Sequence, residues 1–200
     1  MLLRKAPHYT YKPAPLSSAF HQIAPKASLI QASEAKIQHN AQNTCSIRKH
    51  FMVYIFSKFL HLAGAITWIG GMTFMLWILR PVVTAQLQPP QRLPLMAGVM
   101  GRFFPLVWLS IAALLITGTG MLMAVGMKAA PIGWHLMFGI GLLMFALFGH
   151  VYFGPFKRLK QAVTASDWPE AGRRLGQIQA IVKANFVLGW LAIAAVLFLH

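Results

Sequence analysis

Carboxylates are scarce in this 200-residue chain, which contains three Asp and Glu against 18 Lys and Arg. Charged residues make up only 10% of the sequence, whereas hydrophobic residues make up 57%. Soluble domains carry roughly 25% charged residues, so a water-facing surface cannot be built from this composition. The basic residues flank long apolar stretches, which favours an anionic membrane surface over nucleic acid as their partner. The composition therefore predicts a protein of the lipid bilayer that does not bind nucleic acid.

The shortage of cysteine and of acidic groups excludes several kinds of site. Cys45 is the single cysteine, so the chain can form neither an intrachain disulfide nor a thiolate cluster for a metal. The three carboxylates, Glu34, Asp167 and Glu170, all lie outside the apolar stretches. Paired-carboxylate catalysis and proton relays through Asp or Glu are therefore excluded within the membrane. The sequence contains no complete catalytic constellation, and we do not predict an enzyme.

Four apolar stretches each come near the ~20 residues that cross a hydrocarbon core. Backbone polar groups in lipid must be satisfied internally, so each stretch is predicted to be a helix. The spans cover about residues 53–79, 103–125, 132–153 and 181–199. The sequence thus predicts an all-α fold, an integral membrane four-helix bundle over residues 52–200.

Residues 1–51 differ from the rest of the chain, because they are basic, contain scattered prolines and show no sustained periodicity. This composition predicts a disordered N-terminal extension. It is either a targeting leader or, if translation begins at Met52, not part of the protein.

Basic residues are distributed unevenly over the connections. The 80–102 and 156–183 connections carry nine Lys and Arg, whereas the opposite side has Lys58 and Lys128 in addition to any contribution from the extension. Positively charged loops stay in the cytoplasm, so both termini are predicted to lie outside, on the periplasmic side. In the last connection, Asp167 is predicted to cap a helix, with Glu170 at the capping-box position.

Three histidines lie within the apolar spans: His61, His135 and His150. His61 and His135 fall in the outward half of the bilayer, at depths that differ by ~5 Å for a rise of 1.5 Å per residue. His150 lies about 22 Å further along the same helix as His135 and cannot join them. Because intramembrane ionisable residues are rare and usually functional, His61 and His135 are predicted to share a site. His150 is expected at the membrane interface.

Methionines gather on the same outward side, and their thioethers suit Cu(I). Met121, Met123 and Met137 are the candidate ligands. The alternative interpretation is that they fill gaps between apolar helices. In the last span, Asn185 is one turn from Gly189 and is predicted to make an interhelical hydrogen bond.

A series of short motifs in residues 52–200 resembles small CopD-like proteins of the copper-resistance membrane family. The motifs are KFLHLA at 58–63, WIGGM at 68–72, LRP at 79–81, PPQRL at 89–93, GRFFP at 101–105, HLM at 135–137, GHVYF at 149–153, PFKRL at 155–159 and NFVLG at 185–189. The resemblance implies a multi-pass protein of the plasma (inner) membrane that handles copper. Larger members of the family have about twice as many spans, so transport by this chain implies a homo-oligomer or a periplasmic copper-binding partner.

The resemblance and the shared depth together give a first hypothesis for the site. Copper is bound by His61 and His135, and the three methionines are auxiliary ligands. Trp68 and Trp134 are expected to shield this site from lipid.

A second resemblance, to the HemJ-type protoporphyrinogen oxidases, gives an alternative function. Their first helix begins with a similar Lys…Leu-His sequence, matched here by Lys58 and His61. A later helix of these enzymes carries a His-x-Lys triplet, and the corresponding triplet in this chain is His135-Leu136-Met137. The missing lysine counts against that enzyme activity. Binding of haem b stays open, with His61 and His135 as axial ligands and His150 as a further candidate. A third interpretation is a membrane subunit without cofactor, whose histidines serve packing.

Overall fold

The computed structural model describes residues 17–199, which form two compact units divided after Met52. In the first unit the described residues belong to the helix α1, which runs Ser17–Thr73. Within this segment residues 17–51 are helical and residues 1–16 lie outside the described part, and the disorder expected for residues 1–51 stays a prediction. Residues 31–52 are all exposed, so no core holds this part of the helix. Its Ala, Gln, Glu and Lys residues have high intrinsic helix propensity, a signal that apolar periodicity does not report.

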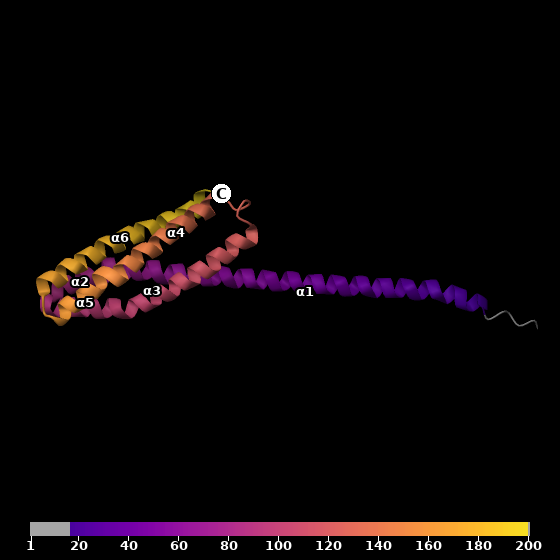
Figure 1. The fold of residues 1–200 in the computed structure, drawn as a ribbon, viewed down its shortest axis with the longest axis horizontal. Coiled ribbons are helices and arrows are strands. Elements are labelled where there is room, and N and C mark those ends of the chain that lie inside the picture. Colours follow the sequence, from indigo (N-terminus) through magenta and orange to yellow (C-terminus); the bar gives the residue numbers. More distant parts are fainter. Residues whose placement is uncertain (1–16, 200) are drawn as a thin grey trace, which may run out of the picture. The chain divides into compact units, whose positions relative to one another are not determined.

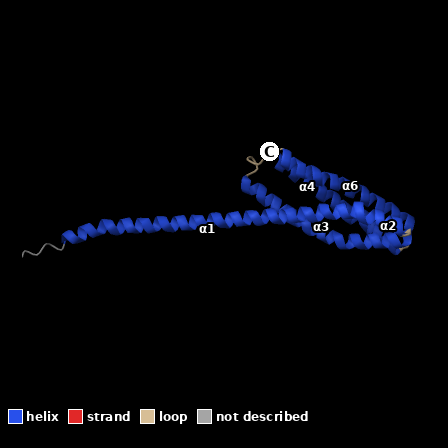
Figure 2. Ribbon diagram, turned by 180° about the vertical axis from the view of Figure 1, so that it is seen from behind, coloured by secondary structure: helices blue, strands red, loops and turns tan. Residues whose placement is uncertain are grey.

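The second unit, Val53–His200, contains the apolar helices. After α1 the elements are η1 (Phe74–Leu79), α2 (Arg80–Gln86), α3 (Pro89–Val125), α4 (Ile132–Val151), η2 (Tyr152–Phe156), α5 (Lys157–Thr164) and α6 (Trp168–Phe198). No strand occurs within residues 17–199 (Figure 2). Helices α4 and α6 lie side by side and make the most extensive contact in the bundle (Figure 1).

Four helical stretches of the described chain are long and apolar enough to cross a membrane. They are Gln31–Gln86, Pro89–Val125, Ile132–Thr164 and Trp168–Phe198. Each contains one predicted span, so the prediction of an all-helical protein with four apolar spans is confirmed. The helices are longer than the spans because they continue into the polar ends, and the run from Leu93 to Met100 belongs to α3 itself. The side of the membrane on which the termini lie stays a prediction.

Particular residues set the ends of two of these helices. Gly126 ends α3 with φ of +90°, a backbone conformation that glycine adopts without the steric cost of a Cβ. The Asp167 carboxylate accepts a hydrogen bond from the backbone N–H of Glu170 over 3.1 Å, so the predicted cap of α6 is confirmed. The Glu170 side chain does not complete a capping box within the described residues, because it pairs with Arg173 and Arg174.

Two π-helical turns interrupt the first and third spans next to prolines. Pro81 follows η1 and has no N–H to donate to the carbonyl of Trp77, four residues earlier. Within η1 the hydrogen bonds shift by one residue, so that the N–H of Arg80 bonds to the carbonyl oxygen of Met75. The turn η2 likewise contains Pro155. Each turn therefore changes the direction of the side chains that follow it.

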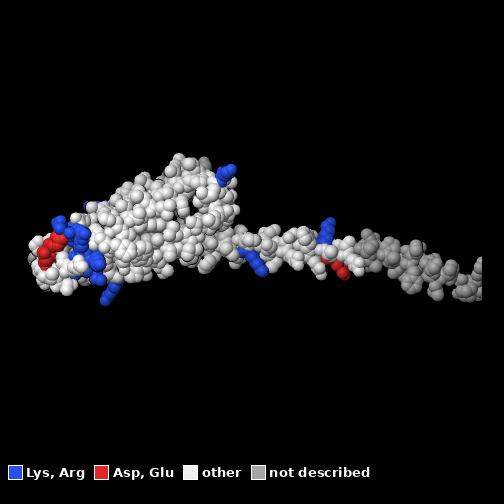
Figure 3. All heavy atoms as spheres, in the orientation of Figure 1, with Lys and Arg blue, Asp and Glu red and all other residues white. Residues whose placement is uncertain are grey.

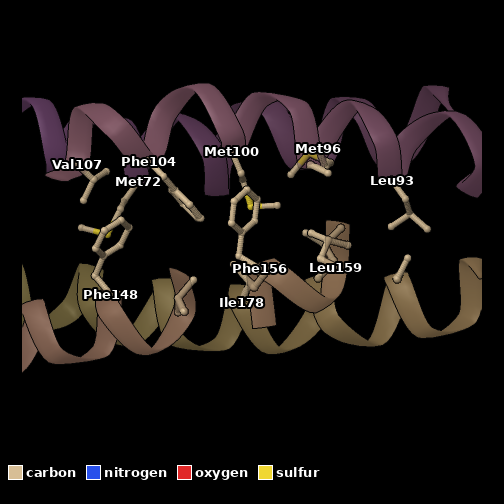
Figure 4. Close-up of a cluster of buried hydrophobic side chains, with 14 of the residues drawn as sticks. Met72, Leu93, Met96, Met100, Phe104, Val107, Phe148, Phe156, Leu159 and Ile178 are labelled. Carbon is tan, nitrogen blue, oxygen red and sulfur yellow. The ribbon is translucent and has the colours of Figure 1, made fainter. Parts of the chain in front are cut away.

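The hydrophobic core lies between α3 on one side and α4, η2, α5 and α6 on the other, with Met72 of α1 packed against it (Figure 4). Its most deeply buried members include Leu93, Leu159 and Ile178, each at most 1% exposed. Phe104 packs edge-on against Phe156, with ring centroids 4.6 Å apart. This core holds together the end of the bundle at which α2 and α5 lie.

In Figure 3 the middle of the bundle surface consists of uncharged residues, whereas Lys and Arg gather at one end. Ile116 and Phe198 are 72% and 79% exposed, and many other large apolar side chains also face outward. An apolar surface of this extent is stable only when lipid covers it. The protein is therefore a multi-pass membrane protein.

Candidate functional site

A cavity of about 770 Å³ lies between α1, α3, α4 and α6, and the core residues Trp68 and Met144 form part of its wall. Most of its lining is apolar, with several aromatic and glycine residues. The residues of chemical interest on its wall are Lys58, His61, Trp68, Met121, Trp134 and Met137. The cavity therefore brings together six of the residues that the sequence singles out.

His61 is held in one orientation by a hydrogen bond between α1 and α3. Its Nδ1 lies 2.9 Å from Oγ1 of Thr117, and that hydroxyl donates its own proton to the carbonyl oxygen of Ala113 at 2.6 Å. Since the hydroxyl has one proton, its oxygen must accept from Nδ1–H of the imidazole. The lone pair of the neutral ring is then on Nε2, which is the atom that binds a metal when Nδ1 is hydrogen-bonded.

Nε2 of His61 is buried and has no hydrogen-bond partner anywhere in the described residues. A buried polar atom without a partner costs free energy, on the order of 1–3 kcal/mol, unless a ligand or water satisfies it. The close approach of α3 confines the imidazole further, because a Cβ at Gly118 would lie 3.3 Å from Cε1 of His61. His61 is therefore a pre-oriented nitrogen donor on the wall of the cavity.

The methionines divide into two groups. Met121 and Met137 line the cavity, from α3 and α4 respectively, and so does Met144, which the sequence does not single out. Met123 is 77% exposed and does not belong to the cavity lining that the described residues form. Two of the three predicted thioether ligands thus share a cavity with His61.

The ring of His135 makes hydrogen bonds outside the cavity. Its Nε2 is 3.0 Å from the carbonyl oxygen of Met127 and its Nδ1 is 3.2 Å from that of Pro131. Both partners are acceptors, so the ring must turn away from at least one of them before it offers a lone pair to a metal. Within the described residues His135 is not part of the cavity wall, and the structure does not bring it together with His61 there.

The other predicted site residues are His150, Lys58, Trp68 and Trp134, and the structure gives the exposure or contacts of each. His150 is exposed near the end of α4. The ammonium of Lys58 lies 4.7 Å from the centre of the Tyr54 ring. Trp68 is 3% exposed and stacks on Phe145 with centroids 5.6 Å apart. Trp134 lines the cavity as a partly buried side chain.

Asn185 makes the predicted interhelical hydrogen bond. Its Nδ2 donates to the carbonyl oxygen of Met144 over 3.2 Å and so joins α6 to α4. Gly189, one turn later, packs against Ile69 and Met144, because its missing Cβ leaves room for these side chains.

Thr117 is the functional residue that the sequence analysis misses. It is 5% exposed in the middle of an apolar helix, and it orients His61. The sequence contains a pattern that could have identified Thr117. Ser110 and Thr117 are seven residues apart, so both polar side chains lie on one face of α3. That spacing matches the seven-residue repeat of His61 and Trp68 on α1.

The donors that the cavity offers are one imidazole nitrogen and thioether sulfur atoms. No group of three or more His, Cys, Asp or Glu side chains that would hold a metal occurs in the described part of the chain. This set suits a soft monovalent ion such as Cu(I) better than a hard divalent cation, which requires several oxygen ligands. The cavity is also large enough for an organic group with an aromatic ring system.

Comparison with known proteins identifies the family of the chain. No curated protein matches the sequence, and no solved structure matches it. The sequence pattern of the family described as copper resistance protein D matches residues 97–199, which include α4, α6 and all but the first turns of α3. His61 precedes the matched region, so its role rests on the structure. Because the match covers half of the sequence, the chain belongs to the copper resistance protein D (CopD) family.

Proposed function

We propose that this CopD-family protein handles copper by binding Cu(I) as cargo in the cavity between α1, α3, α4 and α6. Nε2 of His61 is the nitrogen ligand, and the thioethers of Met121 and Met137 complete the site. The single observation that carries the proposal is the buried, unpartnered Nε2 of His61, oriented by Thr117 on a wall that also carries these sulfur atoms.

The chemistry of the donors supports a monovalent copper ion. Cu(I) accepts low coordination numbers and soft ligands, and neither imidazole nor thioether has to release a proton in the oriented state. Copper binding would also satisfy the buried nitrogen. His135 joins the site only if its ring leaves the carbonyl oxygens of Met127 and Pro131.

The test is a Cu(I) competition titration on the full chain in mild detergent, with a chromophoric Cu(I) chelator under anaerobic reducing conditions. We expect the protein to take one Cu(I) from the chelator and His61→Ala to take none. His150→Ala is the matched control, because His150 is exposed and lies off the cavity wall. Binding by His61→Ala that equals that of the unchanged protein contradicts the proposal. If His135→Ala also loses Cu(I) binding, the ring of His135 moves into the site.

A second candidate function is haem binding, and one observation favours it. The cavity of about 770 Å³ exceeds what a single ion needs, and it places an imidazole nitrogen among aromatic and glycine residues. Haem iron in many proteins is held by one such nitrogen. Lys58, on the same wall, carries the charge that pairs with a carboxylate of a porphyrin.

The two candidates differ in colour. A reduced-minus-oxidised absorption spectrum of the protein from haem-replete cells shows a Soret shift and sharp visible bands if haem is bound. Cu(I) has a filled d shell and gives a flat difference spectrum. Spectral bands that disappear in His61→Ala replace the copper proposal with the haem one. A third result is that the protein purifies with a stoichiometric protein partner and contains neither copper nor haem. That result supports a membrane subunit without cofactor.

A further inference from the structure

A second hollow, of about 470 Å³, lies away from the copper cavity, at the junction of η1, α2 and α6. Its wall consists of six residues: Leu76, Trp77, Arg80, Lys183, Phe186 and Val187. Half of them come from the first span and half from α6, and we refer to them together as the basic groove. The groove combines two cationic side chains with four apolar ones.

The two cations of the groove lack a carboxylate partner in the part of the chain that the structure describes. Of the two carboxylates in the second unit, Glu170 is paired with Arg173 and Arg174, and Asp167 caps α6. Both cations line the same groove, and an anion bound in it would be attracted to both. The chain supplies no such anion at this place within its described residues.

The apolar part of the groove faces outward. Trp77 is 58% exposed and Val187 is 57% exposed, so both side chains face lipid in a membrane protein. The rings of Trp77 and Phe186 pack at a centroid distance of 4.7 Å and form a continuous apolar surface beside Arg80 and Lys183. Tryptophan and basic residues occur together at the boundary between hydrocarbon and headgroups.

We propose that the basic groove binds an anionic phospholipid. Arg80 and Lys183 hold its phosphate, and an acyl chain lies along Trp77, Phe186 and Val187. Basic pockets between transmembrane helices bind such headgroups, because the lipid supplies negative charge and apolar surface in one molecule. Free phosphate offers the same charge but has no group for the apolar part of the groove. The proposal is independent of copper binding, since the two sites share no residue.

The experiment uses quenching of Trp77 fluorescence by lipids with brominated acyl chains. The full chain is reconstituted in phosphatidylcholine vesicles that contain a minor fraction of brominated phosphatidylglycerol or of brominated phosphatidylcholine. The chain has six tryptophans, so the contribution of Trp77 is the difference between the unchanged protein and Trp77→Phe. We expect brominated phosphatidylglycerol to quench Trp77 more strongly than the zwitterionic lipid does.

Substitutions test whether the two cations cause the preference. Arg80→Gln and Lys183→Gln should each lower the relative affinity for phosphatidylglycerol by about fivefold, and the double variant should remove the preference. Arg80→Lys keeps the positive charge and should therefore retain the preference for phosphatidylglycerol. This variant separates the effect of losing the charge from the effect of misfolding. The matched control is the pair Arg102→Gln and Lys157→Gln, which removes two exposed cations that do not line the groove.

Each outcome decides the proposal. Equal quenching of Trp77 by the two brominated lipids overturns it, and so does a preference that survives in the double variant or disappears equally in the control pair. Replacement of chloride by inorganic phosphate at constant ionic strength distinguishes the two sources of phosphate. The lipid preference should persist in phosphate, and its abolition would show a free-anion site instead.

Discussion

The backbone N–H of Gly133 donates to the carbonyl oxygen of Leu199 over 2.8 Å and so joins the first turn of α4 to the end of α6. This bond is possible because Gly133 has no side chain. A Cβ at this position would overlap the carbonyl oxygens of Ala195 and Leu199. The two helices therefore meet closely beside the end of the bundle at which the cavity lies.

Gly133→Ala should destabilise the protein by about 1–3 kcal/mol, because backbone carbonyls cannot move aside as a flexible side chain can. The measurement is thermal unfolding in mild detergent. Gly139→Ala is the control on the same helix, since its Cβ would meet nothing within 4 Å. An unchanged midpoint for Gly133→Ala would contradict the close packing.

Thr117→Val should weaken Cu(I) binding by about 10-fold to 100-fold, the usual effect of losing a hydrogen-bond partner of a metal-binding histidine. Valine has nearly the same shape but cannot accept from Nδ1 of His61, so the ring loses its fixed tautomer. Thr117→Ser retains the hydroxyl and should restore binding. Chelator competition measures both variants, and equal affinity for Val and Ser would assign Thr117 to packing alone.

Met121→Leu and Met137→Leu should each weaken Cu(I) binding by about tenfold, which corresponds to about 1.4 kcal/mol. Leucine replaces methionine with little change of volume, so the loss reports the sulfur atom. Met123→Leu serves as control, because Met123 is exposed and lies off the cavity wall in the described structure. A similar decrease in all three variants would mean that the thioethers do not bind the ion.

Asp167→Ala should lower stability by about 1 kcal/mol, because the first turn of α6 loses its side-chain cap. Asp167→Asn also has an oxygen that accepts from the N–H of Glu170 and should be nearly neutral. Thermal unfolding distinguishes these two variants. If both lose the same stability, the charge of Asp167 matters and its hydrogen bond does not.

The sequence is sufficient to predict the four spans, because hydropathy over about 20 residues reports transfer into lipid directly. It also identifies His61, since an ionisable residue in an apolar span is costly and therefore noticeable. The lengths of the helices are less predictable. They depend on how far each helix continues beyond its apolar span, as α1 does before Met52. They also depend on tertiary packing, such as the burial of Leu93 in the first turns of α3.

The sequence is not sufficient to predict whether His61 and His135 share a site. Rise per residue fixes the depth of a side chain, but its direction about the helix axis depends on packing. His135 is near the N-terminus of α4, beside the 126–131 connection. The Met127 carbonyl in this connection and that of Pro131 at its end accept from the His135 ring, and the sequence gives no sign of this competition.

The uneven distribution of charge has an electrical consequence for the whole bundle. Within residues 53–200, one end carries nine cations and two carboxylates, whereas the other carries Lys58 and Lys128; the seven Lys and Arg and the one Glu of residues 1–52 are not included in this count. A membrane potential acts on this difference with about 2.3 kcal/mol per elementary charge per 100 mV. Inverting the bundle in an energised membrane would therefore cost or release on the order of 10 kcal/mol per 100 mV. For residues 53–200 alone, a membrane potential therefore favours one orientation over the inverted one.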